Sequence, residues 1–136
     1  MKKILIDTNI VLDLALERVG FVEGALKLLR FTAKNKIKLC ITASSVTDIY
    51  YVLRKQKGHD SAIGLLKKFF QFSKVLGVDE EIITEALNSE MKDFEDAVQT
   101  KTAICNDIDI IITRDKKDFE NSDLEIYTPD EYINEF

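Results

Sequence analysis

The sequence is poor in the residues that build disulfide scaffolds, zinc sites and flexible linkers. It has two cysteines, one histidine, one proline, five glycines and no tryptophan. Cys40 and Cys105 lie far apart among apolar neighbours, which is typical of reduced core thiols. His59 and two cysteines supply too few nitrogen and sulfur ligands for a zinc site. Any bound metal is therefore expected to be held by oxygen, which favours Mg²⁺ or Mn²⁺.

Long apolar runs and a targeting segment are also absent. Runs such as Ile110–Ile112 are too short to cross a bilayer, so no membrane association is expected. The opening Met1-Lys2-Lys3 leads into a short apolar run that ends at a charge, whereas a secretory signal needs a longer apolar stretch. A cytoplasmic location is therefore expected. Repeats and linker-like segments are missing too, which predicts a single domain over residues 1–136.

Basic residues do not dominate the chain. The net charge is −5, with 46% hydrophobic and 32% charged residues, which is typical of a soluble globular protein. This balance argues mildly against a protein that coats nucleic acid. It does not argue against a nuclease, because acidic residues that hold a metal attract phosphate once the metal is bound.

Apolar periodicity predicts strands that alternate with helices. The strands are expected at residues 3–7, 38–42, 75–78, 108–113 and 125–128. The helices are expected at residues 8–18, 21–34, 44–57, 59–72, 80–88, 93–105 and 129 to about 136. Strands separated by helices imply a parallel sheet covered on both faces. In such sheets the functional crevice lies beyond the carboxyl ends of the strands, where the strand order reverses.

Aspartates follow the two most apolar strands. Asp7 comes directly after Ile4–Ile6, and Asp115 follows Ile110–Ile112 by three residues. Each aspartate alone is more typical of a helix cap or a turn than of a catalytic site. Together they lie at the edge of the sheet where a ligand crevice is expected.

Two further acids lie near the starts of predicted helices. Asp48 has an alternative interpretation as the capping-box partner of Ser45, and Asp96 as the partner of an Asp93 cap. Both helices would begin near the carboxyl edge of the sheet, where their acids could meet those at the strand ends. Such a cluster would repel strongly and would require a cation. Spacing alone does not establish that these side chains converge.

Four segments in this order resemble the PIN-domain nucleases, including the VapC-type toxins of bacterial toxin–antitoxin pairs. The opening strand and its Asp-Thr-Asn triplet lie at Ile4–Asn9, and the second motif lies at Thr42–Arg54. The third motif is Asp93–Gln99, and the fourth is Ile110–Phe119 with Thr113-Arg114-Asp115. No single motif is specific, but four in the expected order are fairly specific together.

The resemblance implies a three-layer α/β/α sandwich with a central, mostly parallel sheet. The catalytic acids that it implies are Asp7, Asp48, Asp96 and Asp115, which would hold one or two Mg²⁺ or Mn²⁺ ions together with Asp93. The groups that would orient carboxylates or water are Thr8, Asn9 and Thr113. Many members of the family carry Glu where this chain has Asp48, and the shorter Asp side chain puts direct metal binding by Asp48 in doubt.

The expected function is therefore a metal-dependent ribonuclease that hydrolyses RNA phosphodiester bonds, with a cognate antitoxin and a homodimer implied by the family. The basic residues expected to contact RNA phosphates are Arg54, Arg114, Lys116 and Lys117. Tyr50 and Tyr51 are candidate stacking platforms, although packing in the core or in a dimer is the commoner role. The main alternative is a catalytically inactive PIN-like module that binds RNA or protein. A phospho-acceptor domain would pair acids at the first strand, and a nucleotide binder would carry a glycine-rich loop there.

Overall fold

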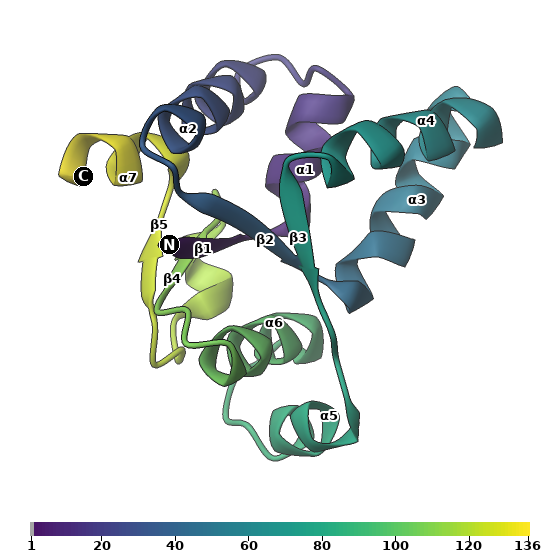
Figure 1. Ribbon diagram of the computed structural model, residues 1–136. Helices are drawn as coiled ribbons and strands as arrows, with labels where there is room; N and C mark the ends of the chain where they lie inside the picture. Colours follow the sequence, from purple (N-terminus) through teal and green to yellow (C-terminus); the bar gives the residue numbers. More distant parts are fainter. Residues whose placement is uncertain (1) are drawn as a thin grey trace.

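A five-stranded parallel sheet organises the chain, and helices cover both of its faces (Figure 1). The computed structural model describes residues 2–136. The strands are β1 (Lys3–Ile6), β2 (Lys38–Thr42), β3 (Ser73–Leu76), β4 (Ile110–Ile112) and β5 (Glu125–Tyr127), in the order β3-β2-β1-β4-β5. All neighbouring pairs are parallel. The predicted three-layer α/β/α class is confirmed.

The helices divide between the two faces of the sheet. Their bounds are α1 (Thr8–Ala15), α2 (Val22–Lys34), α3 (Ala43–Lys57), α4 (His59–Phe70), α5 (Glu80–Leu87), α6 (Phe94–Cys105) and α7 (Pro129–Glu135), with a short 3₁₀ helix η1 at Lys116–Phe119. Figure 1 shows α1, α2, α3, α4 and α7 on one side and α5 and α6 on the other. Within residues 2–136, no helix is long and apolar enough to cross a membrane.

The central strands are apolar on both faces because each face meets a layer of helices. In β1, Ile4 and Ile6 belong to the core under α1 and α3, whereas Leu5 belongs to the core under α6. In β4, Ile110 and Ile112 face the first core, and Ile111 faces the second. This alternation with a period of two explains why both strands appear in the sequence as unbroken apolar runs.

Several element boundaries differ from the prediction, and two of the differences have clear local reasons. The strand predicted at 75–78 runs over Ser73–Leu76, because Ser73 pairs with Leu39 and donates a hydrogen bond to the carbonyl of Phe69. The helix predicted at 8–18 ends at Ala15. Two residues later, Glu17 adopts a left-handed φ of 49°, which does not continue an α-helix. The 3₁₀ helix η1 was not predicted. Polar or short segments at an edge carry little periodicity, which explains these differences.

The strand order places β1 at the point where the chain changes direction across the sheet. β1 pairs with β2 on one side and with β4 on the other, with Leu5 opposite both Cys40 and Ile111. Beyond β1, the amide of Asp7 continues the ladder by donating to the carbonyl of Ile112 at 2.9 Å. The carboxyl ends of β1 and β4 therefore meet at the switch point.

Candidate metal-binding active site

Asp7 is the most constrained acid at this edge of the sheet. It is the N-cap of α1, and its Oδ1 accepts hydrogen bonds from the amide of Thr8 at 2.7 Å and from Nε2 of Gln99 at 3.0 Å. Its Oδ2 accepts from the hydroxyl of Thr113 at 2.9 Å. Burial raises the pKa of Asp7 above its ordinary value despite these bonds, and repulsion from Asp115 adds to the shift. The capping and site roles of Asp7 are thus combined in one side chain.

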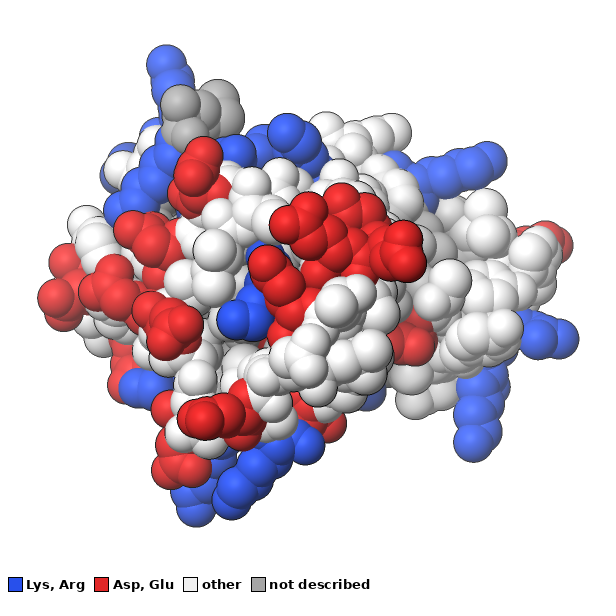
Figure 2. Space-filling model, turned by 90° about the horizontal axis from the view of Figure 1, so that it is seen from below, with Lys and Arg blue, Asp and Glu red and all other residues white. Residues whose placement is uncertain are grey.

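Further acids gather around a cavity of about 320 Å³ beside Asp7. The acidic residues that line it are Asp7, Asp48, Asp93, Glu95, Asp96 and Asp118. Asp7 and Asp93 are the N-caps of α1 and α6, and the other acids lie in α3, α6 and η1, so the cavity joins segments that are distant in sequence. Asp and Glu also dominate the surface on the side of α5 and α6, where Lys and Arg project mainly at the margins (Figure 2).

Asp96 and Glu95 show how strongly these carboxylates disfavour one another's charge. Burial is the largest cause that raises the pKa of Asp96 to about 8, and repulsion from Asp93 and Asp7 follows. The pKa of Glu95 is raised to about 7, and loss of hydration on burial is the largest cause. A hydrogen bond shared with Asp48 and repulsion from the Asp48 charge raise it further. Glu95 is exposed as a residue, yet its carboxyl group faces other acids at the cavity. Without a cation, the site keeps protons at neutral pH.

The first turn of α6 explains where its acids lie. Asp93 is the N-cap, and its Oδ1 accepts from the amide of Asp96 at 3.0 Å. The capping alternative is therefore correct for Asp93. For Asp48 the cap is instead Thr42, whose hydroxyl accepts from the amide of Ser45 at 3.3 Å. Asp48 is exposed in the second turn of α3 and lines the cavity.

Asp115 lies near Asp7 but outside the lining of the cavity. Its Oδ2 accepts from Nδ2 of Asn9 at 2.8 Å, and its amide donates to the hydroxyl of Thr113 at 3.0 Å. Within residues 2–136, Asp118 rather than Asp115 is the acid of this region that lines the cavity. Thr113 and Asn9 therefore orient two carboxylates, whereas Thr8 contributes its amide to Asp7.

Sequence comparison agrees with this arrangement. The sequence profile of the PIN domain matches residues 3–117, which include every acid at the cavity except Asp118. The chain belongs to the PIN-domain family. The resemblance inferred from the four motifs is thereby confirmed.

Individual relatives of this PIN domain span nearly its whole length. Ribonuclease VapC1 of Aquifex aeolicus (strain VF5) is 24% identical over 136 residues, which cover 96% of this chain and 93% of the relative. The DNA-bound VapBC structure from Salmonella typhimurium matches with a TM-score of 0.73 at 14% identity, over 95% of this chain and 99% of that chain. The structure of VapC20 from Mycobacterium tuberculosis, a sarcin–ricin loop cleaving toxin, matches with a TM-score of 0.66 at 15% identity. The match covers 79% of this chain and 86% of that chain. The solved structures establish the shared fold.

The donor chemistry of the PIN domain fits a hard divalent cation. All the acids at the cavity offer oxygen, and their mutual repulsion remains without a cation to neutralise it. Of the three buried side-chain oxygens without a hydrogen-bond partner in residues 2–136, two lie in this region, the hydroxyl of Thr8 at the cavity and Oε1 of Gln99, whose Nε2 binds Asp7. The acids do not enclose an ion, since no group of three His, Cys, Asp or Glu residues within 2–136 is arranged to hold one.

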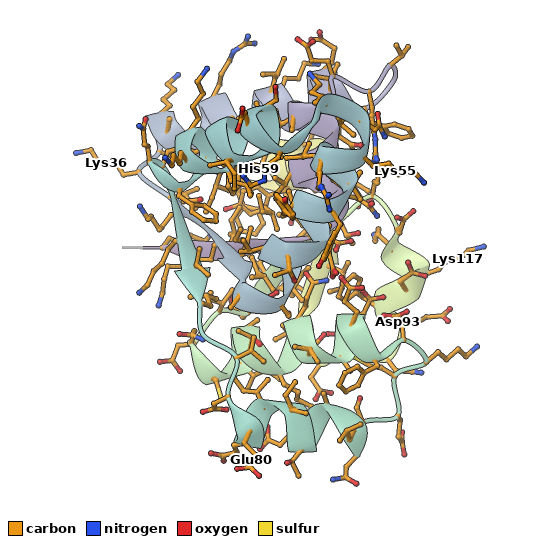
Figure 3. All side chains as sticks on the ribbon, turned by 90° about the vertical axis from the view of Figure 1, so that its right-hand side faces the viewer. Lys36, Lys55, His59, Glu80, Asp93 and Lys117 are labelled. Carbon is orange, nitrogen blue, oxygen red and sulfur yellow. The ribbon has the colours of Figure 1, made fainter. Side chains whose placement is uncertain are left out.

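The predicted basic contacts lie in different environments. Arg114 donates from Nε to Asp13 at 3.0 Å, and its guanidinium lies 4.0 Å from the ring centre of Phe21. Lys116 pairs with Glu131 at 3.1 Å. Arg54 and Lys117 are exposed, and neither forms an ion pair within the described residues. Figure 3 places Lys117 on the same side of the molecule as Asp93.

Four residues that the sequence analysis did not assign to the site contribute to this PIN domain. They are Asp13, Glu95, Gln99 and Asp118. Gln99 was visible in the sequence as the last residue of the third motif. Its role became clear only in the structure, where α6 buries a run of polar residues that an ordinary amphipathic helix would expose. Asp13 had no signal in the sequence, because its partner Arg114 lies 101 residues away. Asp118 was visible only as part of the fourth motif.

Proposed function

We propose that this PIN domain is a Mg²⁺- or Mn²⁺-dependent endoribonuclease that hydrolyses RNA phosphodiester bonds as the toxin of a toxin–antitoxin pair. The observation that carries the proposal is the convergence of carboxylates from four elements on one cavity with their charges uncompensated. A fold has no structural need for such a cluster, because it costs stability unless a ligand neutralises it.

The relatives support both the reaction and the substrate class. The curated relative over nearly the whole chain is named a ribonuclease. The structural relative from Mycobacterium tuberculosis is a toxin that cleaves the sarcin–ricin loop. We extend RNA cleavage to this chain on these two grounds and on the acidic cavity.

In this proposal the cavity acids hold one or two divalent ions. Asp7, Asp96 and, from beside the cavity, Asp115 are the main ligands, and Asp48 and Asp93 assist them. A bound divalent ion would neutralise phosphate charge, stabilise the leaving oxygen and make water acidic enough to act as the nucleophile.

The chain's own residues hold the carboxylates in place. They also give Glu95 a different tendency to bind a proton from that of an ordinary glutamate. Three donors hold Asp7, which prevents its carboxylate from rotating out of the cavity. Asn9 holds Asp115 from the first turn of α1. Glu95, whose carboxyl group shares a hydrogen bond with Asp48, can take up or release a proton close to neutral pH.

The proposal includes a protein partner and an assembly. The structural relative from Salmonella typhimurium is a VapBC complex bound to DNA, and we propose a cognate antitoxin for this chain on that basis. A homodimer in the cytoplasm completes the proposed state. Sedimentation of the purified chain, alone and with the product of a neighbouring small reading frame, tests both assemblies.

The alternative is a PIN-like module that binds RNA or protein without cleaving. An inactive site would have no use for Mn²⁺, whereas the proposed enzyme binds it. Titration of Mn²⁺ into the metal-free protein, followed by calorimetry or electron paramagnetic resonance, separates the two alternatives.

The decisive experiment is cleavage of a mixed RNA pool with Mg²⁺ or Mn²⁺, with EDTA as the metal-free condition. Asp96→Asn should lower the cleavage rate by at least about 100-fold, because even groups that only orient metal ligands are worth 10- to 100-fold. Asp60→Asn makes the same change at an exposed position in α4 and should cleave as the wild type does. Metal-independent cleavage, or equal rates for both variants, would contradict the proposal.

A further inference from the structure

Helix α3 leads from the acidic cavity to an open hollow on the same side of the molecule. Asp48 and Val52 of α3 line the cavity. The hollow has a volume of about 410 Å³ and is lined by Tyr51, Arg54 and Lys55. The cavity and the hollow are thus adjacent along one helix.

Helical geometry aligns these residues into one path. Positions three, four and seven apart lie on the same face of an α-helix, so Tyr51 and Lys55 follow Asp48 along that face. Lys55 lies ~10 Å from Asp48 along the axis, at 1.5 Å per residue. That length corresponds to ~3 stacked nucleotides at 3.4 Å per step. Figure 3 shows Lys55 on the same side as Asp93 and Lys117, with Lys36 on the opposite side.

The ring of Tyr51 is exposed and braced. Its relative exposure is 63%, and it points away from the buried side of α3, which is formed by Ser45, Ile49 and Leu53. The ring of Tyr50 meets it edge-on, with 5.5 Å between ring centres. The hydroxyl of Tyr50 and Nδ1 of His59 share a hydrogen bond of 2.8 Å, which fixes Tyr50 in turn. A braced aromatic ring loses little conformational entropy when a base stacks on it.

The charges beside Tyr51 are free to meet phosphate. Arg54 and Lys55 are exposed, and neither forms an ion pair within residues 2–136. The chain as a whole carries a net charge of −5, so uncompensated cations next to an exposed aromatic ring contrast with its overall composition. Stacking platforms combined with cations are the features by which proteins bind single-stranded nucleic acid.

We propose that Tyr51, Arg54 and Lys55 form a docking strip for a single-stranded segment of the RNA substrate. One base stacks on Tyr51, and the phosphates that flank it lie on Arg54 and Lys55. The strip holds nucleotides about one to three steps from the scissile phosphate. The inference rests on the proposed ribonuclease function and adds the strand state of the substrate and the direction in which it leaves the cavity.

The test measures RNA affinity and cleavage separately. Affinity for a fluorescent single-stranded oligonucleotide is measured with Mg²⁺ in the Asp96→Asn background, where cleavage is suppressed, and kcat/KM is measured in the wild-type background. Tyr51→Ala should weaken binding by at least about fivefold, the lower end of the loss for one stacked base, whereas Tyr51→Phe should retain it. Lys55→Ala should weaken binding. It should also reduce the steepness of the plot of log binding constant against log salt concentration by about 0.7, the value for one lost phosphate contact. Lys57→Ala removes the same charge from the end of the same helix, outside the lining of the hollow, and should change little.

The outcomes distinguish the strip from the nuclease proposal. If the wild type cleaves RNA but Tyr51→Ala and Lys55→Ala bind and cleave like Lys57→Ala, the strip is wrong and the nuclease stands. If Tyr51→Ala changes the oligomeric mass without changing RNA affinity, the surface serves a second copy of the chain and the strip is again overturned. If the strip variants lose RNA binding while the wild type cleaves nothing, the strip stands and the nuclease is wrong. If no form binds RNA, both are wrong.

Discussion

Thr113 donates a hydrogen bond of 2.9 Å to Asp7 across 106 residues of sequence. The same hydroxyl accepts the amide of Asp115 at 3.0 Å. One side chain thus links the acid after β1 to the loop after β4. Replacing Thr113 with the similarly shaped valine would leave Oδ2 of a buried carboxylate without this donor.

Thr113→Val should therefore lower both stability and metal binding. The loss of a donor to a buried charged group costs about 1–3 kcal/mol in the free energy of unfolding. The looser Asp7 should weaken Mn²⁺ affinity by about 10- to 100-fold. Denaturant unfolding and Mn²⁺ titration measure the two effects. Thr113→Ser keeps the hydroxyl and should stay near the wild type, and equal behaviour of the valine variant would refute this role.

Asp13 should prove important for stability although it lies outside the cavity. It is buried, and its carboxylate accepts from Arg114 at 3.0 Å and from Arg18 at 3.4 Å. Asp13→Ala should lower the free energy of unfolding by about 3 kcal/mol, because it strands partly buried guanidinium groups. For a chain of this size that corresponds to a fall in Tm of roughly 10 °C. Arg18→Ala should cost much less, and a similar loss in both variants would point to general packing.

The stability of the metal-free protein should fall as the pH rises from about 4 to about 8. In the folded state the pKa of Asp96 is about 8 and that of Glu95 about 7, against ordinary values of 3.8 and 4.5. Within that window the folded chain binds more protons than the unfolded chain, so the free energy of unfolding decreases with pH. Thermal unfolding in EDTA at about pH 5 and about pH 8 measures the difference.

Metal and mutation provide the controls for this pH dependence. Asp96→Asn should flatten the profile, since it removes the group with the largest shift. Mn²⁺ at about 100 times the Kd that applies at about pH 8 should add about 2.7 kcal/mol to the free energy of unfolding there. The same Mn²⁺ concentration should add less at about pH 5, where protons compete for the acids. A metal-free protein that grows more stable between pH 5 and pH 8 would be inconsistent with these shifted acids.

Lys117 and Lys116 should differ as RNA contacts. Lys116 is paired with Glu131, whereas Lys117 is exposed beside Asp93 and forms no ion pair within residues 2–136. For single-stranded RNA, Lys117→Ala should reduce the steepness of the plot of log binding constant against log salt concentration by about 0.7. Lys116→Ala should reduce this slope by less. Binding isotherms at several salt concentrations measure the slopes. Identical slopes for the two variants would exclude a selective role for Lys117.

The fold was accessible from the sequence because its periodicities are strong. The apolar runs at Ile4–Ile6 and Ile110–Ile112 are buried on both faces, so they indicated parallel strands without any knowledge of their partners. The acids at their ends followed from the geometry of parallel sheets. The edge strand that begins at Ser73 has polar residues at its start, and its first two residues were missed.

The details of the site were less accessible because they depend on how helices dock. The sequence placed Arg114 beside phosphate, but nothing in it indicated that Asp13 would turn inward and bind that guanidinium. Gln99 reaches Asp7 only because α6 packs with a polar face against the sheet. Glu95 became a site residue for the same reason. Local patterns identify which residues are acidic, but tertiary contacts decide which acids share a cavity.

The bonds that hold Asp7 have a consequence for the order of folding. Its partners Gln99 and Thr113 lie 92 and 106 residues away, whereas β2, the other neighbour of β1, begins at Lys38. Contacts of such long sequence separation form late, because closing the intervening chain costs entropy that local helices do not pay. During synthesis the half of the sheet with β1, β2 and β3 can assemble well before β4 and α6 have left the ribosome. We therefore expect the acidic site to be among the last parts of this protein to form.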